Sequence, residues 1–376
     1  MFLHGAPSEL REPGTYPPDR AQTEPLPVLA DGRRRTGNGH SRAKRLRLPA
    51  LIVTMTLVVT ASVAWRVIAQ SPTTEARKDR TPEASGDFVV EVRAGDSALA
   101  IGRRLADLGV LESDSAFADA ARSQTPSGTF EPGFYVVATG GEAADVVRQF
   151  VDPARRVGLV VVAAGRRLDD VTDAATGQVS EGLLGSISRA SCVPSNGRRR
   201  CLTVADLRRA AALASAEQLM VPEWARERVT SLTGDHRRLE GLISVGQWSF
   251  DPTDSPTQAL ATLISASAMR YDHNAVLRTA AEELGMTPYQ LLIVASIVQQ
   301  EGRPADYSRI AADIYDRLRQ GVRLQRQSTR LYSQATGLDS RGGDRLSPWD
   351  TVEIVGLPAT PISVPSEQAI AVAQHP

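Results

Sequence analysis

The longest unbroken run of apolar positions lies near the start of the chain. Residues Leu48–Trp65, LPALIVTMTLVVTASVAW, have only Thr and Ser as polar residues, and Val67–Ala69 continue the run beyond Arg66. Residues 48–69 are therefore long enough for a tilted transmembrane helix. A buried core helix would normally show a polar face, and a cleaved signal peptide normally has a much shorter basic region in front of it. We expect a single-pass, uncleaved signal anchor.

The segment before this run, residues 1–47, is polar and basic. It has nine Arg or Lys residues, most of them between Arg33 and Arg47, and few large apolar residues. Such a composition cannot bury enough surface to offset chain entropy, so we expect a disordered tail. The basic flank places the N-terminus in the cytoplasm and everything after Gln70 outside it, with the anchor in the cell membrane. Residues 70–86 have the polar, turn-rich composition of a linker.

Alternating and helical hydrophobic patterns then predict a small α/β module over residues 87–152. In the first helix, Leu99, Ile101, Leu105 and Leu108 are expected to face inward. The expected elements are a strand at Phe88–Val92, helices at Ser97–Leu108 and Ser113–Ala121, a strand at Gly133–Val137 and a helix at Glu142–Val151.

Residues 157–376 predict a larger, mainly helical α+β domain. A buried strand at Val157–Val162 opens it, and the end of the chain is expected to be irregular and rich in Pro and Gly. The expected helices are Leu168–Asp173, Thr203–Gln218, Thr257–Ala268, Asn274–Leu284, Pro288–Glu301 and Tyr307–Leu318.

Charge and cysteine content narrow the function classes. Lys plus Arg and Asp plus Glu are equal at 43 each, so no global charge favours nucleic acid. The two cysteines, Cys192 and Cys201, lie close together in a region expected outside the cytoplasm, which favours a disulfide over two unpaired thiols. A metal site would need further ligands nearby, and no metal or other cofactor is expected.

The clearest local pattern is TPYQLLIVASIVQQEGR, which ends in Glu301 and Gly302. Thr287 is expected to cap a helix, with Pro288 at its first position and Gln290 completing a capping box. The nearly unbroken apolar run that follows predicts burial on most sides. A carboxylate at the C-terminal end of a buried helix has its pKa raised by the helix dipole and by desolvation, as a general acid requires. The alternative is that Glu301 only ends the helix in water.

The block Ala295–Gly302, ASIVQQEG, resembles the A-S-I-V-E-x-E block of the endolytic murein (lytic) transglycosylase family, the MltG/YceG-like proteins. The second Glu of the family block is the catalytic one and falls on Glu301, whereas the first falls on Gln299. Further blocks follow in the family order and extend the resemblance from about Phe88 to the end. These blocks are RLEGLI from Arg238 with Gly246 and Trp248, IYDRL at Ile314–Leu318, LQRQSTRLY at Leu324–Tyr332, and SPWDTV with GLPATPI within Ser347–Ile362.

Upstream, VRAGDS, GVLESDSAF and FEPGFY resemble the LysM-like module of the same family. Several polar family positions differ here. The Asn of N-R-L is Asp316, the Asp of the Q-x-D block is Gln327, the N-T-Y motif is Asp350-Thr351-Val352, and the Glu-Gly after the first strand of the catalytic region is Ala164-Gly165.

The resemblance implies a mechanism that uses one carboxyl group. Glu301 would protonate the oxygen between MurNAc and GlcNAc and then take the proton of the MurNAc C6 hydroxyl, which closes a 1,6-anhydro ring. Glu240, Gln325, Thr329 and Asp350 are expected to contact the sugars. The implied partners are nascent peptidoglycan glycan strands and the synthases that make them.

The rival interpretation is a non-catalytic wall-binding scaffold of the same fold. The altered polar positions favour the scaffold, and the retention of Glu301 in its block favours the enzyme.

Overall fold

The computed structural model of the chain describes residues 86–125, 129–173, 176–195, 198–273, 276–335 and 346–375. The expected tail, the membrane anchor at 48–69 and most of the linker at 70–86 lie outside the described residues. Among the residues that are described, no helix combines the length and apolar character needed to cross a membrane.

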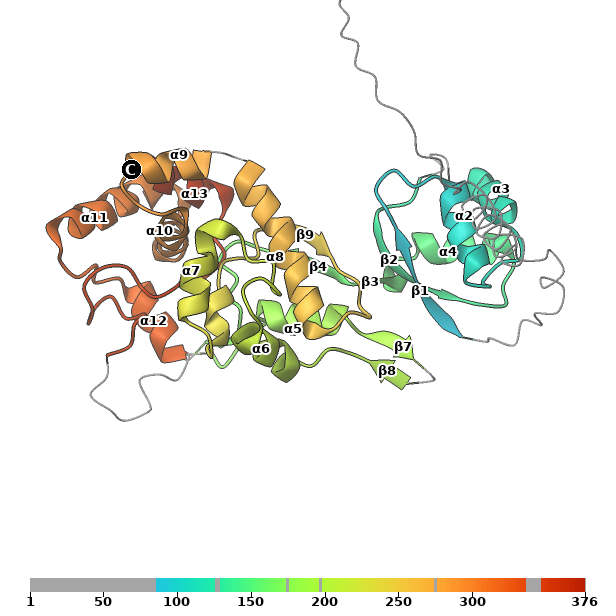
Figure 1. Cartoon of the computed structure of the whole chain (residues 1–376), viewed down its shortest axis with the longest axis horizontal. Coiled ribbons are helices and arrows are strands. Elements are labelled where there is room, and N and C mark those ends of the chain that lie inside the picture. The colour runs from blue at the N-terminus through green and yellow to red at the C-terminus, as the bar shows by residue number, and fades with distance from the viewer. Residues whose placement is uncertain are drawn as a thin grey trace, which may run out of the picture. The chain divides into compact units, whose positions relative to one another are not determined.

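The first part of the described chain is a three-stranded antiparallel sheet with helices beside it (Figure 1). The strand order is β1-β2-β3, with Val90 opposite Tyr135 and Phe134 opposite Val157. Its elements are β1 (Asp87–Val92), α2 (Ala98–Asp107), α3 (Asp114–Gln124), β2 (Gly133–Ala138), α4 (Ala143–Val151), η1 (Pro153–Arg155) and β3 (Arg156–Val157).

This part has a hydrophobic core of its own. Ile101, Leu105 and Phe117 are fully buried in it, and the Phe150 ring lies 5.1 Å from the Tyr135 ring and 5.4 Å from the Phe117 ring. The expected inward face of α2 was partly wrong, because Leu99 and Leu108 are each 39% exposed. The helix buries a narrower stripe than its sequence suggested, with Ile101, Gly102 and Leu105 as its buried residues.

The second part is mainly helical, with three two-stranded antiparallel sheets. The strands pair as β4 (Leu159–Val162) with β9 (Gly246–Ser249), β5 (Val171–Thr172) with β6 (Val179–Ser180), and β7 (Val193–Ser195) with β8 (Arg198–Arg200). The helices are α5 (Leu183–Ala190), α6 (Val204–Leu213), α7 (Glu223–Ser231), η2 (His236–Leu239), α8 (Pro256–His273), α9 (Val276–Glu283), α10 (Pro288–Glu301), η3 (Pro304–Asp306), α11 (Tyr307–Gln320), α12 (Gln327–Ala335) and α13 (Glu367–Gln374).

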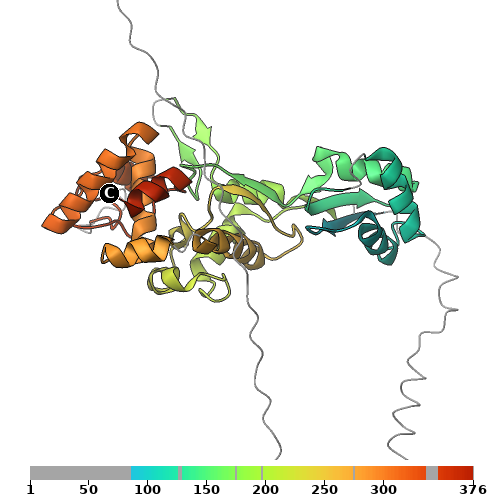
Figure 2. The same ribbon diagram turned by 90° about the horizontal axis from the view of Figure 1, so that it is seen from above.

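The helix α10 is the centre of this second part. Every residue from Leu291 to Val298 is buried, and α10 contacts α7, α9, α11, α12 and α13 (Figures 1 and 2). The expected capping box is present, with Thr287 Oγ1 accepting from Gln290 N and Thr287 N donating to the Gln290 side chain. A helix that is apolar on all sides is stable only when it is surrounded in this way.

Two expectations for the second part were wrong. The strand expected at Val157–Val162 breaks at Gly158, whose φ is +66° and where an added Cβ would lie 2.0 Å from the Phe250 carbonyl oxygen. No helix forms at 168–173, because Leu168 donates its N–H to the distant carboxylate of Glu240. The Pro- and Gly-rich stretch expected to be irregular, residues 344–366, has no helix or strand in its described part, 346–366, and the helices α12 and α13, which were not expected, lie before and after it.

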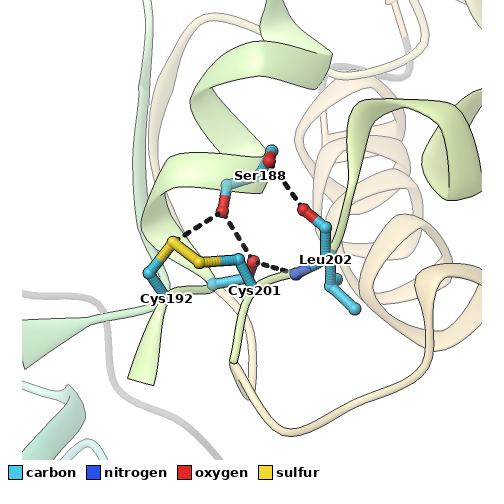
Figure 3. The surroundings of a disulfide bond; sticks show 5 residues. Ser188, Cys192, Cys201 and Leu202 are labelled. Atoms are coloured by element: carbon cyan, nitrogen blue, oxygen red, sulfur yellow. Dashed lines mark hydrogen bonds between the residues drawn. A yellow bond between two sulfur atoms is a disulfide. The ribbon is translucent and has the colours of Figure 1, made fainter. Parts of the chain in front are cut away.

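A disulfide joins Cys192, just after α5, to Cys201, with the Cα atoms 4.2 Å apart (Figure 3). Serine hydroxyls tie the same two segments together: Ser188 Oγ donates to the Leu202 carbonyl oxygen at 2.6 Å, and Leu202 N donates to Ser191 Oγ at 2.8 Å. The bridge and these hydrogen bonds close the β7–β8 hairpin at its base.

Candidate active site

Glu301 is the last residue of α10, and its carboxylate is bound by the start of α12. Its Oε1 accepts a hydrogen bond from the backbone N–H of Ser328, the second residue of α12, at 2.8 Å. The side chain is half-buried. An N–H in the first turn of a helix has no partner within that helix, so a carboxylate satisfies it well. Glu301 therefore lies between the end of one helix and the start of another.

Two threonines fix the start of α12. Thr329 Oγ1 and Thr351 Oγ1 are 2.8 Å apart, and Thr329 is completely buried. Thr351 also accepts a hydrogen bond from Gln325 N through its carbonyl oxygen at 2.9 Å. These contacts connect two of the sequence blocks noted above, and they place the N–H of Ser328 against Glu301.

Asp350 lies in the same region but is occupied by an intramolecular ion pair. Its Oδ2 accepts from Arg330 Nε at 3.0 Å, and its Oδ1 accepts from Val352 N at 2.9 Å. Arg330 also donates to Glu353 at 2.6 Å. The Asp350 side chain is only 7% exposed. Its predicted contact with sugar stays a prediction, and in this structure its carboxylate orders the α12 surface.

Arg326 brings a positive charge close to Glu301. Its guanidinium forms an ion pair with Asp313 on α11, and Asp313 also pairs with Arg317. Burial lowers the pKa of Arg326, and the negative charge of Glu301 opposes that shift. Arg326 was not among the candidate residues predicted from the sequence, because only the fold brings it near Glu301.

Glu240 is buried, and both its oxygens are engaged. Its Oε1 accepts from Leu168 N at 2.9 Å and its Oε2 from the Tyr332 hydroxyl at 3.0 Å. Burial raises the pKa of Glu240 to about 7, although these hydrogen bonds and the charge of Arg167 act in the opposite direction. With 2% exposure, Glu240 joins the loop after β4 to α12. Its predicted role in sugar binding stays a prediction.

Gln325 is exposed and adopts a left-handed backbone with a φ of +54°. Its Oε1 accepts from Arg317 at 3.3 Å. Of the four residues expected to contact the sugars, Gln325 is therefore the most accessible. Thr329 and Glu240 lie beneath the surface, where they support α12.

The two glutamines before Glu301 bind neighbouring loops. Gln299 Oε1 accepts from Ser366 N at 3.0 Å, and Gln300 Nε2 donates to the Gly165 carbonyl oxygen at 2.9 Å. Gly302 follows the last residue of α10 and has an extended backbone. A Cβ there would lie 2.5 Å from Ile310 Cδ1, so close packing of α11 favours glycine. Together these contacts fix the last turn of α10.

Within the described residues, His, Cys, Asp and Glu side chains do not gather into a group that could hold a metal ion. The arrangement at Glu301 offers one carboxyl group that can exchange a proton, a backbone N–H that orients it and a nearby guanidinium. That chemistry suits general acid–base catalysis by a single residue.

These observations define the class of protein: it is a mixed α+β chain in which a buried central helix ends in one oriented acid. Within that class, the chain belongs to the YceG-like family, whose sequence profile matches residues 90–376. This is the family that the sequence motifs indicated.

Among solved structures, a yceG-like protein from Listeria monocytogenes is similar at 19% identity, with a TM-score of 0.42. The match covers 77% of this chain and 90% of that chain. No curated protein matches the chain.

Proposed function

We propose that the chain is an endolytic lytic transglycosylase that cuts MurNAc–GlcNAc bonds of nascent glycan strands and leaves 1,6-anhydro-MurNAc ends. The observation that carries the proposal is the orientation of Glu301 by Ser328 N at the end of α10. Membership of the YceG-like family supports it. Cutting within a strand would end its elongation.

In this mechanism one carboxyl group acts first as a general acid and then as a general base. Protonated Glu301 gives its proton to the glycosidic oxygen as the bond to C1 breaks. The resulting carboxylate then accepts the proton of the C6 hydroxyl as that oxygen bonds to C1. No water enters, so a second carboxylate at the spacing used by hydrolases is not needed. The Ser328 N–H holds one carboxylate oxygen in place, which leaves the other for proton transfer.

The remaining assignments extend this proposal to the whole chain. Residues 48–69 anchor the protein in the cell membrane, with the tail at 1–47 in the cytoplasm and the catalytic region at 157–376 outside. The part at 87–152 acts as a LysM-like module that binds glycan. Peptidoglycan synthases are the proposed protein partners, because the substrate strand leaves them.

The test is direct. Purified full-length protein is incubated with uncrosslinked glycan strands, and the products are examined by mass spectrometry for anhydro-MurNAc ends. Wild-type protein is expected to produce them, and Glu301→Gln is not. Absence of anhydro ends with wild-type protein would refute the proposal.

A wall-binding scaffold is the second candidate. It is favoured by the contacts of Asp350 and Gln299, two altered family positions whose side chains are engaged within the protein. A scaffold would bind glycan strands without producing anhydro ends, and the same assay separates the two functions.

A further inference from the structure

The β7–β8 hairpin has one strand that is made only of arginines. Its second strand, β8, consists of Arg198, Arg199 and Arg200, and the described ranges of the chain have no other run of three arginines. All three side chains are exposed. The hairpin extends beyond the helices α5 and α6 (Figure 1), and the Cys192–Cys201 bridge closes its base. It therefore presents three positive charges on a covalently fixed support.

The charges of β8 are not neutralised within the protein. Many arginines of the second part pair with a carboxylate, as Arg189 does with Glu181. By contrast, Arg200 Nη1 donates to the carbonyl oxygen of Thr253 at 3.2 Å, and no described carboxylate forms an ion pair with any arginine of β8. Charged side chains also protect an exposed strand edge from pairing with another chain, but that role does not require charges of one sign.

Three carboxylates lie near Arg200 without pairing with it. Asp87, Glu91 and Asp251 line the same cavity as Arg200. Each of them already has a partner within the chain: Asp87 pairs with Arg155, Glu91 pairs with Arg93, and Asp251 accepts hydrogen bonds from Thr253. The positive charge of β8 is therefore available to a partner outside the chain.

The hairpin also lies beside the place where the chain arrives from the expected membrane anchor. The strand β1 begins at Asp87, directly after the linker expected at residues 70–86, and β1 contacts β7. A polar linker of about 17 residues spans about 23 Å on average and at most about 60 Å. A tether of this length gives even a weak binding surface a high effective concentration at the membrane. The lipid around the anchor is therefore always within reach of β8.

We propose that β8 binds the anionic phospholipid headgroups of the membrane in which the chain is anchored. The guanidinium groups donate to lipid phosphate oxygens, whose geometry they match. Each arginine near an anionic surface strengthens binding by about fivefold, so three together strengthen it by about a hundredfold. This contact holds the second part of the chain against the membrane, where the linker alone would let it move away. The inference rests on the proposed anchor and not on the proposed catalytic activity.

The test uses the full-length chain in lipid nanodiscs. Thr253 is exposed beside Arg200, so Thr253→Cys provides a labelling site, and its thiol is the only free one because Cys192 and Cys201 are paired. Energy transfer from a dye on this site to acceptor dyes on the headgroups reports the distance to the membrane. Discs of phosphatidylcholine are compared with discs that also contain phosphatidylglycerol. Transfer is expected to be about twofold or more higher in the anionic discs, and the difference should vanish at about 1 M salt, where the Debye length is about 3 Å.

Matched triple variants test the location. Exchange of all three β8 arginines for Gln should abolish the increase, and exchange of the same three for Lys should keep it, because Lys retains the charge. The control triple variant removes the same charge from exposed positions on α6, α9 and α11 and should keep the increase. Its substitutions are Arg209→Gln, Arg278→Gln and Arg319→Gln.

Three results would overturn the assignment. They are equal transfer in the two kinds of disc, an undiminished increase after the Gln exchange in β8, and an equal loss in the control variant. If transfer is equal in both discs and poly-glutamate binds wild type but not the β8 Gln variant, the arginines bind an acidic protein and not lipid.

Failure of this inference is distinguishable from failure of the proposed function. The β8 Gln variant is altered outside the candidate active site and should form anhydro ends from soluble glycan strands as wild type does. If wild type shows the lipid effect but forms no anhydro ends, the membrane contact stands without the enzyme. If the wild-type chain is not retained in the discs, the proposed anchor is wrong and the membrane contact is refuted with it.

Discussion

The carboxylate of Glu301 accepts the backbone N–H of Ser328 at 2.8 Å, so the end of α10 and the start of α12 meet at one side chain. From the sequence, Glu301 is placed only at the C-terminal end of α10. In the structure, the positive end of α12 reaches the same carboxylate. Glu301 is therefore an oriented group and not merely the solvated end of a helix.

Replacing Glu301 is the first test of function. Glu301→Gln can still accept from Ser328 N through its amide oxygen, but it cannot give and take back a proton. Formation of anhydro ends is expected to fall by about 100- to 10,000-fold, with Tm close to wild type. Gln299→Glu is the matched control, because a carboxylate oxygen can accept from Ser366 N equally well and activity should persist. Equal activity of Glu301→Gln and wild type would exclude Glu301 as the acid.

Asp350 and Arg330 should behave as a coupled pair. Sequence resemblance alone predicts that Asp350→Asn leaves activity unchanged or raises it, since it restores the family residue. The structure predicts a lower Tm, because the change leaves Arg330 with Glu353 alone. The double variant Arg330→Val, Asp350→Asn should recover part of the loss. A thermal melt of both single variants and the double variant measures the coupling, and additive effects would refute it.

Glu240 should make stability depend on pH. Its pKa of about 7 in the folded chain exceeds the ordinary value of 4.5, so the folded state binds more protons between these values. The free energy of unfolding should therefore be largest below about pH 4.5 and fall as pH rises to about 7, by on the order of 3 kcal/mol. Glu240→Gln keeps an acceptor for Leu168 N and Tyr332 and should remove this part of the slope.

Denaturant unfolding between pH 4.5 and 8 measures that slope, and only the difference between variant and wild type counts. Glu223→Gln, which changes an exposed carboxylate on α7, is the control and should leave the slope unchanged. An identical pH dependence in Glu240→Gln and wild type would contradict the assignment.

The Cys192–Cys201 bridge should protect both thiols from alkylation until reductant is added. The enclosed loop is short, so chain entropy predicts a loss of about 2–3 kcal/mol on removing the bridge. The double variant Cys192→Ser, Cys201→Ser should show that loss in denaturant unfolding. Labelling of both cysteines in freshly isolated, unreduced protein would argue against the bridge.

Topology can be tested without any activity assay. A reporter that works only outside the cytoplasm should be active when fused after Gly86 and inactive when fused before Arg42. The reverse pattern would place the catalytic region in the cytoplasm, away from its proposed glycan substrate.

The sequence predicted local structure best where the signal was local. The limits of α10 follow from Thr287, Pro288 and the apolar run, and all of these lie within the helix or at its N-cap. The helix α12 was missed because its sequence, QSTRLYSQA, is polar and rich in hydroxyl side chains. Its stability depends on distant partners: Thr329 bonds to Thr351 and Tyr332 to Glu240.

Dependence on distant partners also explains which contacts of the candidate site the sequence did not predict. Glu301 was selected by its block, but the role of Ser328 depends on a contact 27 residues along the chain. The helix expected at Leu168–Asp173 failed because Leu168 N bonds to Glu240, 72 residues away. Helix propensity and hydrophobic periodicity depend on neighbouring residues and do not predict contacts between residues so far apart in sequence.

The contact between Arg330 and Asp350 also changes how divergence in this chain is understood. The two positions lie 20 residues apart, and Asp350 stands where the family motif quoted above has Asn. Along the sequence, this Asp counts as one isolated departure. In three dimensions its charge is balanced by Arg330, so the two residues form one unit. Substitutions intended to change the charge of this surface of α12 must therefore be introduced in pairs.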